Sequence, residues 1–188
     1  HADEIVFTSG GTESDNVAIQ GVVKAWKKDN PTVSELPHIV ISAIEHPAVK
    51  KTVEDLEHSG LITVSYISVD EQGLICEKEL KEVFQKEKNI ILVSVMLVNN
   101  EIGTIQPIAH VASLIRKYRK DHGSVYPYLH TDACQAPCYL DMQIDKLGVD
   151  LLSLDGGKIY GPRGVGCLYR KRGVRIEKIF HGGAQESD

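Results

Sequence analysis

Five short polar clusters in this sequence combine side chains that could carry out chemistry on a carbonyl group. Each follows a run of apolar residues, and the clusters are Ser9–Thr12, Glu45–His46, Asn99–Glu101, Asp132–Gln135 and Asp155–Lys158. A lysine on a glycine-rich turn can reach inward and form an imine with a carbonyl. A carboxylate paired with a ring nitrogen keeps a pyridinium protonated, and the ring then withdraws electrons more strongly. Each cluster alone is a weak signal, but together they form a constellation that predicts such chemistry.

Three residues of these clusters are candidates for the reacting end of a site. Lys158 lies in a turn rich in glycine, Asp132 follows a predicted strand, and His46 precedes Pro47 at the start of a predicted helix. An imidazole at that position could stack on a flat ring and move protons. Each residue also has an ordinary alternative: Lys158 as a surface lysine, Asp132 as a solvated turn residue, and His46 as a helix cap.

The other clusters favour contacts with anions and amides. A glycine pair precedes Thr12 between a strand and a helix, which lets backbone N–H groups approach an anion at the helix N-terminus. A tight turn with a helix cap is the alternative. Asn99–Glu101 ends the most apolar strand, where strongly polar groups need partners. Hydrogen bonding within the loop is the alternative there, above all for Asn99 and Glu101.

Strand-like and helix-like segments alternate between the clusters. The predicted strands are Ile5–Thr8, Ile39–Ser42, Ile62–Val69, Ile90–Val98, Tyr128–Thr131, Leu151–Leu154 and Val165–Tyr169. Amphipathic helices are predicted from about Thr12, from Pro47, over Glu77–Lys86 and from Pro107, with a polar connection over Asp121–Tyr126. This order predicts a three-layer α/β/α fold with a mostly parallel sheet. Ligands bind beyond the carboxyl ends of the strands in such sheets, so the clusters are expected to converge at one edge.

Composition and charge exclude several classes of function. The net charge is -5, and the two basic runs, Lys24–Lys28 and Arg116–Lys120, fall toward the ends of predicted helices, so no nucleic-acid surface is expected. The four cysteines show neither a disulfide framework nor paired metal-ligand spacing, which predicts reduced thiols in a cytoplasmic compartment and no metal site. The longest apolar run, Ile90–Val98, is too short to span a bilayer.

Five motifs resemble those of one enzyme family in order and spacing. They read FTSGGTESDNVAI, AIEHPAV, VNNEIGTIQPI, HTDACQAP and GGKIYGPRGVGCLY. They are similar to the cysteine desulfurases, which belong to the aminotransferase class-V branch of the fold-type I pyridoxal-phosphate enzymes. The resemblance runs from Asp3 to Glu186. It implies the fold-type I large domain and pyridoxal 5'-phosphate as the cofactor.

The resemblance also implies roles for three residues at the reactive end of the cofactor. Lys158 would hold the cofactor covalently, Asp132 would pair with the pyridine nitrogen, and His46 would stack on the ring and assist proton transfer. Lys158 and His46 are therefore the expected catalytic residues.

Four further residues would hold the rest of the cofactor. The resemblance implies that Asn100 and Gln135 bond its phenolic oxygen side and that Gly11 and Thr12 hold its phosphate. The implied reaction removes sulfur from L-cysteine and gives L-alanine and an enzyme persulfide, for iron-sulfur cluster assembly or another sulfur-transfer pathway. The implied partners are a second copy of the protein in a homodimer and a sulfur-acceptor or scaffold protein.

The sequence departs from the family pattern in three respects. The family usually reads Ser-Gly-His-Lys where this chain has Asp155-Gly156-Gly157-Lys158, so a phosphate-binding serine and histidine are replaced. An aspartate beside a phosphate is repulsive unless it points away or is protonated, so weaker phosphate binding is expected. None of the four cysteines matches the family's nucleophile. Residues 1–188 are therefore expected to be one cofactor-binding large domain truncated at both ends, without the small domain and the catalytic-cysteine loop, and inactive alone.

Two alternatives to a desulfurase remain open. A selenocysteine lyase uses nearly the same cofactor core, and the segment with the nucleophilic cysteine would distinguish the two. A non-catalytic relative would keep the fold for assembly or partner binding, and Asp155 and Gly157 are its main support.

Overall fold

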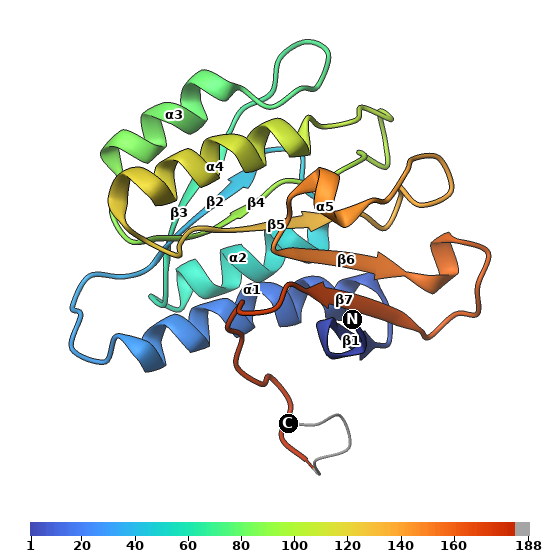
Figure 1. Ribbon diagram of the computed structural model, residues 1–188, viewed down its shortest axis with the longest axis horizontal. Helices are drawn as coiled ribbons and strands as arrows, with labels where there is room; N and C mark the ends of the chain where they lie inside the picture. The colour runs from blue at the N-terminus through green and yellow to red at the C-terminus, as the bar shows by residue number, and fades with distance from the viewer. Residues whose placement is uncertain (183–188) are drawn as a thin grey trace.

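Seven strands form a single sheet in the computed structural model, which describes residues 1–182 (Figure 1). Their order is β1-β7-β6-β5-β4-β2-β3. The strands are β1 (Ile5–Thr8), β2 (His38–Ser42), β3 (Thr63–Ile67), β4 (Ile90–Ser94), β5 (Tyr128–Asp132), β6 (Leu151–Asp155) and β7 (Gly166–Arg170). Strands β3, β2, β4, β5 and β6 are mutually parallel, and β7 pairs antiparallel with both β6 and β1. Residues 183–188, the last part of the predicted domain, lie outside the described residues.

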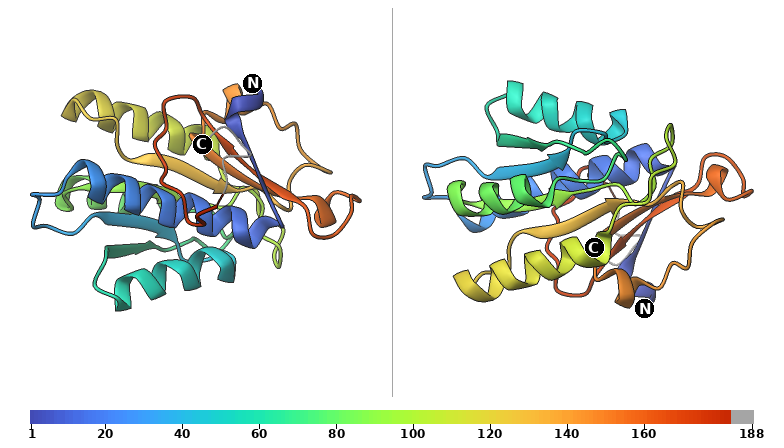
Figure 2. Two further views of the ribbon diagram at one scale, coloured as in Figure 1. Left: turned by 90° about the horizontal axis from the view of Figure 1, so that it is seen from below. Right: turned by 90° about the horizontal axis from the view of Figure 1, so that it is seen from above.

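Helices cover both faces of this sheet. The helices are α1 (Gly11–Asp29), α2 (Pro47–His58), α3 (Glu77–Lys86), α4 (Ile108–His122) and the single turn α5 (Ile144–Leu147), with short 3-10 turns η1 (Ala2–Glu4) and η2 (Gly156–Lys158). Helices α1 and α2 pack on one core, and α3, α4 and α5 pack on the other. Figure 2 shows α2 and α4 on opposite sides of the sheet. The predicted three-layer α/β/α fold with a mostly parallel sheet is confirmed.

The two cores follow from the two-residue period of the strands. In β2, Ile39 and Ile41 enter the core beneath α1 and α2, whereas Val40 enters the core beneath α3 and α4. In β6, Leu151 and Leu152 divide between the cores in the same way. Side chains of a strand alternate between faces, so a strand covered on both faces must be apolar at every position. This explains the unbroken apolar runs of the sequence.

Local sequence determines where the helices begin and end. Helix α2 starts with Pro47, whose missing N–H costs nothing in a first turn, and the His46 Nδ1 atom accepts a hydrogen bond from the Ala48 N–H at 3.1 Å. Helix α4 is capped by Gly123, which has a φ of 59° and therefore adopts the left-handed conformation that glycine tolerates best. The last turn of α1 carries basic residues, as predicted, and complements the helix dipole.

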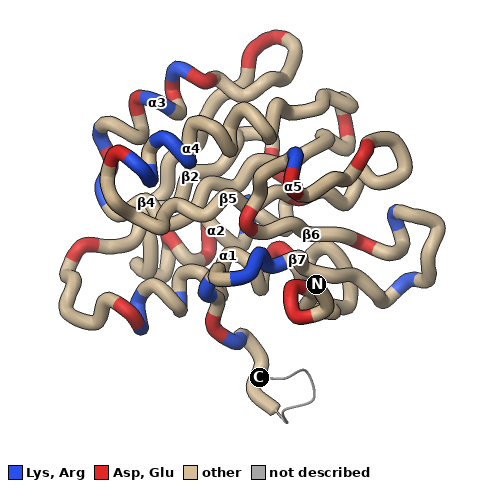
Figure 3. Tube along the Cα trace, in the orientation of Figure 1, with Lys and Arg blue, Asp and Glu red and all other residues tan. Residues whose placement is uncertain are grey.

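Charged residues of both signs are interspersed along the chain (Figure 3). Helix α3 shows the pattern most clearly, because Lys78 and Glu82 pair at 3.8 Å and Lys81 pairs with Glu77. Among residues 1–182, no helix is long and apolar enough to cross a membrane.

The predicted elements differ from the structure most at β4, α4 and α5. Strand β4 ends at Ser94 rather than at the predicted Val98. The reason is that its neighbour β2 ends at Ser42, and the Met96 N–H donates to the Glu45 carboxylate at 2.8 Å instead of to a strand carbonyl. Helix α4 continues to His122 through the start of the predicted polar connection. The single turn α5 was not predicted, because a helix of that length has too few residues for a periodic pattern.

Candidate functional site

A pocket at the carboxyl edge of the sheet brings together all seven predicted site residues. Gly11, Thr12, His46, Asn100, Asp132, Gln135 and Lys158 all line it, with Asp15, Met96, Val98, Cys134 and Asp155. These residues come from segments that follow β1, β2, β4, β5 and β6. Parallel strands end at the same edge, and β1 shares their direction because β7 pairs antiparallel with both β1 and β6. The predicted convergence is therefore confirmed, whereas the individual roles stay predictions.

Two buried carboxyl groups form the floor of this pocket. Asp132 is 7% exposed and ends β5, where its Oδ1 atom accepts the Cys134 N–H at 2.9 Å. Asp15 is 1% exposed, and its Oδ1 atom has no hydrogen-bond partner among the described residues. Burial, together with the nearby negative charge of Asp132, raises the pKa of Asp15 well above its usual value. A group with a positively charged N–H placed here would meet two acceptors.

Asp15 is the residue that the sequence interpretation missed. It was not among the predicted site residues, yet a signal for it existed. Asp15 precedes Ala18 by three residues and Val22 by seven, which is the helical spacing of the buried face of α1. An acidic residue on an apolar helical stripe needs a partner or a proton, and it therefore marks a candidate site.

His130 lies beneath the two carboxyl groups as a neutral ring. It is fully buried in β5, and its two nitrogens lie 2.8 Å from Ser94 Oγ and 3.0 Å from Ser153 Oγ. Burial lowers the pKa of His130 to about 4. Its Nε2 atom is 3.5 Å from Asp15 Oδ1, so at neutral pH it supplies polarity but no charge to the floor of the pocket.

His46 is a helix cap that also lines the pocket, and its stacking and proton transfer stay predictions. Its Nδ1 atom caps α2, and the same ring lines the pocket beside Asp132. The capping bond therefore fixes the orientation of the ring. His46, Asp15 and Asp132 also offer ligand atoms within 4.8 Å of one another, which is the kind of grouping that can hold a metal ion, and the same groups lie where a ring nitrogen is expected.

Glu45 supports the segment behind the pocket. It is 6% exposed, its Oε1 atom accepts from the Met96 N–H and the Ser42 hydroxyl, and its Oε2 atom has no partner among the described residues. Burial raises the pKa of Glu45 to about 8. At neutral pH the folded protein therefore holds this carboxyl group mostly in its protonated form.

Glu45→Gln is expected to flatten the dependence of stability on pH. Between pH 4.5 and about 8 the folded state binds more protons at Glu45 than the unfolded state does. The free energy of unfolding therefore falls as pH rises, by up to about 1.4 kcal/mol per pH unit. Glutamine does not titrate, so urea midpoints measured at pH 5, 6.5 and 8 should fall less in the variant. Equal slopes in Glu45→Gln and the wild type would contradict this, and the exposed Glu71→Gln serves as the control.

Asn99 and Asn100 lie in the loop after β4 and have different environments. Asn99 is buried; its Oδ1 atom accepts the N–H groups of Glu101 and Ile102, and its Nδ2 atom donates to the Ile44 carbonyl at 3.0 Å. The predicted internal hydrogen bonding is therefore confirmed for Asn99. Asn100 is exposed and lines the pocket, so it alone of the two can meet a ligand there.

Lys158 and Asp155 line the pocket from the end of β6 and the turn that follows it. Lys158 ends the turn η2 and is exposed. The Oδ1 atom of Asp155 accepts the Gly157 N–H at 2.8 Å, and its Oδ2 atom accepts the Gly11 N–H at 3.2 Å. The carboxylate therefore does not turn toward solvent, which is one way in which its repulsion of a phosphate could be relieved. It lies against the first turn of α1, beside Gly11 and Thr12.

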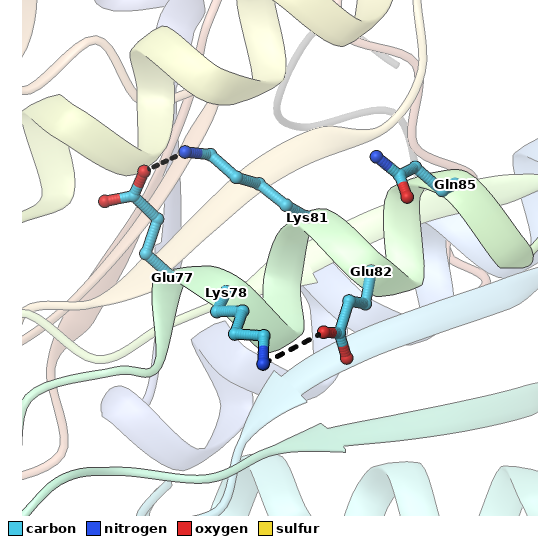
Figure 4. A pocket seen from close by; sticks show the side chains of 5 residues that line it. All are labelled: Glu77, Lys78, Lys81, Glu82 and Gln85. Atoms are coloured by element: carbon cyan, nitrogen blue, oxygen red, sulfur yellow. Dashed lines mark ion pairs between the residues drawn. The ribbon is translucent and has the colours of Figure 1, made fainter.

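A hollow on the outer surface of α3 lies apart from this site. It is lined by Glu77, Lys78, Lys81, Glu82 and Gln85, and Figure 4 shows the four charged side chains joined in two ion pairs along the helix. Its charges are neutralised within the helix, so it offers no set of converging groups for a ligand.

Comparison with known proteins identifies the family. The aminotransferase class-V profile matches residues 1–187. The chain belongs to the aminotransferase class-V family. It is 42% identical to the cysteine desulfurase IscS of Dictyoglomus turgidum over 187 residues, which cover 100% of this chain and 43% of that relative. It is 40% identical to the mitochondrial cysteine desulfurase of Saccharomyces cerevisiae, covering 97% of this chain and 34% of the relative.

A solved structure supports the same placement in this class-V family. The structure described as SspA in complex with cysteine matches with a TM-score of 0.82 and 38% identity, over 98% of this chain and 49% of that one. The chain spans less than half the length of the curated relatives it matches. The matches therefore establish the family and the fold of this chain. The reaction of the whole protein is proposed below.

The pocket fits the cofactor that class-V membership implies, with one exception. Asp132 and the unpartnered Oδ1 atom of Asp15 suit a protonated ring nitrogen, because each is an acceptor in a buried place. Only glycine fits at position 11, since a Cβ atom there would lie 2.5 Å from Cys134 Sγ. At the end expected to hold a phosphate, however, the Asp155 carboxylate already accepts the Gly11 N–H. The ring end fits pyridoxal 5'-phosphate, and the phosphate end carries a resident anion.

Proposed function

We propose that this chain is the cofactor-binding core of a pyridoxal 5'-phosphate-dependent cysteine desulfurase. One observation carries the proposal: Lys158, Asp132 and His46 line a single pocket at the carboxyl edge of the sheet. The relatives named as cysteine desulfurases, and the matching structure described as a complex with cysteine, support L-cysteine as the substrate. The proposed products are L-alanine and a persulfide on a cysteine of the protein.

Each residue at the reacting end has a proposed task. When bound, the cofactor withdraws electrons from the substrate carbons, which weakens the bond between carbon and sulfur. Lys158 holds the cofactor covalently and moves a proton at its amine. Asp132 keeps the ring nitrogen protonated, and His46 stacks on the ring in the orientation set by its capping bond.

The remaining contacts hold the cofactor in place. Asn100 and Gln135 are proposed to bond its phenolic oxygen side, and Gly11 and Thr12 to contact its phosphate; all four line the pocket. The proposed domain of residues 1–188 is then the large cofactor-binding domain, whose described part carries every one of these groups.

The sulfur-accepting thiol is proposed to come from outside the four cysteines of this chain. Cys134 is the one in the pocket, but burial raises its pKa, so it stays a protonated and weakly nucleophilic thiol at neutral pH. A thiolate must attack the substrate sulfur while the bond to carbon breaks. Such a thiolate has to approach the open side of the pocket, where Lys158 and Asn100 are exposed.

The test uses the full-length protein. Added pyridoxal 5'-phosphate should produce a bound visible absorption band, and the loaded protein should release sulfide from L-cysteine in the presence of a thiol reductant. L-selenocysteine is assayed in parallel, and turnover of it alone would favour a selenocysteine lyase. A protein that stays colourless would contradict the proposal and favour a relative that keeps the fold for assembly.

We also propose a cytoplasmic homodimer that passes sulfur to an acceptor or scaffold protein for iron-sulfur cluster assembly. The family resemblance supports a site near the dimer interface, and the exposed rings of Phe7 and Tyr160, 67% and 92% exposed, are consistent with a covered face. All four cysteines are free thiols, which supports a reducing compartment. Light scattering on the full-length protein should give the mass of a dimer, and a monomer at every concentration would contradict it.

A further inference from the structure

The carboxylate of Asp155 bridges two segments at the mouth of the pocket. One of its oxygens accepts the N–H of Gly157, the neighbour of Lys158, at 2.8 Å. The other accepts the N–H of Gly11, which is 144 positions away in the sequence, at 3.2 Å. Gly11 is the first residue of the 19-residue helix α1. The carboxylate therefore ties the turn that carries Lys158 to the N-terminus of a long helix.

This position is the one that an external anion would occupy. The first N–H groups of a helix have no partner within the helix, and the helix dipole favours negative charge beside them. Asp155 also fills the space in front of this turn: a Cβ atom built on Gly10 would lie 3.3 Å from its Oδ2 atom, and one built on Gly11 would lie 3.6 Å from it. A phosphate cannot share the Gly11 N–H and that space with the carboxylate.

We propose that Asp155 is an internal anion that the phosphate of the cofactor must displace, and that it thereby sets how strongly the protein prefers pyridoxal 5'-phosphate over unphosphorylated pyridoxal. This inference rests on the proposed function. The phosphate gains the Gly11 N–H at the tip of α1 only when its bond to Asp155 is released, and the phosphate then lies near a second negative charge. Both effects weaken the contribution of the phosphate to the binding affinity. They leave the ring end unchanged, because no hydrogen bond within the described residues joins Asp155 to Asp132, Asp15 or His46.

The experiment compares two ligands on the full-length apoprotein. Dissociation constants for pyridoxal 5'-phosphate and for pyridoxal are measured by absorption titration in the wild type, Asp155→Asn and Asp155→Ser. The ratio of the pyridoxal constant to the pyridoxal phosphate constant should rise about tenfold or more in both variants, given roughly 1.5–3 kcal/mol for a hydrogen bond to a charged group. Inorganic phosphate should also compete with pyridoxal phosphate at lower concentration in the variants.

Asp121→Asn is the matched control. It removes one negative charge from an exposed residue at the end of α4, which lies at the opposite edge of the sheet from the pocket. Its affinity ratio should equal that of the wild type. Thermal melts of each apoprotein show that the variants are folded, and Asp155→Ser keeps a hydroxyl acceptor for the Gly157 N–H in case Asp155→Asn is unstable.

The outcomes separate this inference from the proposed function. If the wild type binds the cofactor but neither variant changes the ratio, Asp155 does not compete with the phosphate and the inference is wrong. An equal gain for both ligands would also overturn it, because the phosphate would then not be what Asp155 opposes. If no form binds either ligand, the proposed function itself fails.

Discussion

Lys158→Ala in the full-length protein is expected to abolish covalent retention of the cofactor and to lower turnover by roughly 10²–10⁴-fold, the range for loss of a proton-transferring group. Lys158 ends η2 and lines the same pocket as the carboxyl groups of Asp132 and Asp15. Among residues 1–182, it is the only lysine in the lining, so no other amine there could replace it. Borohydride reduction and peptide mapping should place the pyridoxyl label on Lys158.

Lys146→Ala provides the control for this experiment. Lys146 lies on α5, its side chain is 71% exposed, and it pairs with Asp141 at 3.7 Å outside the pocket. The control should keep the label and the turnover of the wild type. A label on Lys146 or Lys171, or a Lys158→Ala protein that retains the cofactor through gel filtration after reduction, would show that the assignment is wrong.

Asp132→Asn is expected to lower turnover by about 10- to 100-fold, which corresponds to the roughly 1.5–3 kcal/mol of a hydrogen bond to a charged group. The asparagine oxygen can still accept the Cys134 N–H, so the turn after β5 should persist while the charge opposite the ring nitrogen is lost. The loss should appear in kcat more than in KM, because the charge supports electron withdrawal rather than substrate binding. The visible band of the bound cofactor should also shift.

Asp150→Asn distinguishes this loss from a general effect of removing a buried carboxylate. Asp150 is 4% exposed and pairs with Arg119 beside β6, away from the pocket. We expect Asp150→Asn to lower the melting temperature with little change in kcat. We expect Asp132→Asn to lower kcat with little change in the melting temperature. A normal kcat in a folded Asp132→Asn protein would remove Asp132 from its proposed role.

Much of this site was predictable because its signals are local. Each predicted residue follows a strand whose apolar run or β-branched content marks it, and Pro47 and Gly123 mark helix ends through their own backbone preferences. Strands that alternate with helices must lie parallel, so the polar residues after them must meet at one edge. Periodicity and turn chemistry therefore predicted the fold class and the convergence of the clusters that contain Gly11, His46, Asp132 and Lys158, whereas the roles of these residues were implied by the family resemblance.

Only the tertiary structure decided which charges in that pocket lack a partner. The raised pKa of Asp15 depends on burial and on Asp132, which comes from a strand far along the chain. The pKa of Glu45 is raised because the carboxyl group is buried against the segment that follows β4, where it accepts the Met96 N–H. In the sequence, Asp155 is visible only as a difference from the family pattern three residues before Lys158. Its hydrogen bond with the Gly11 N–H joins positions 144 residues apart and is visible only in the structure. Such contacts are determined by strand order and packing, so no local pattern can reveal whether a carboxylate points to solvent or occupies the N-terminus of a distant helix.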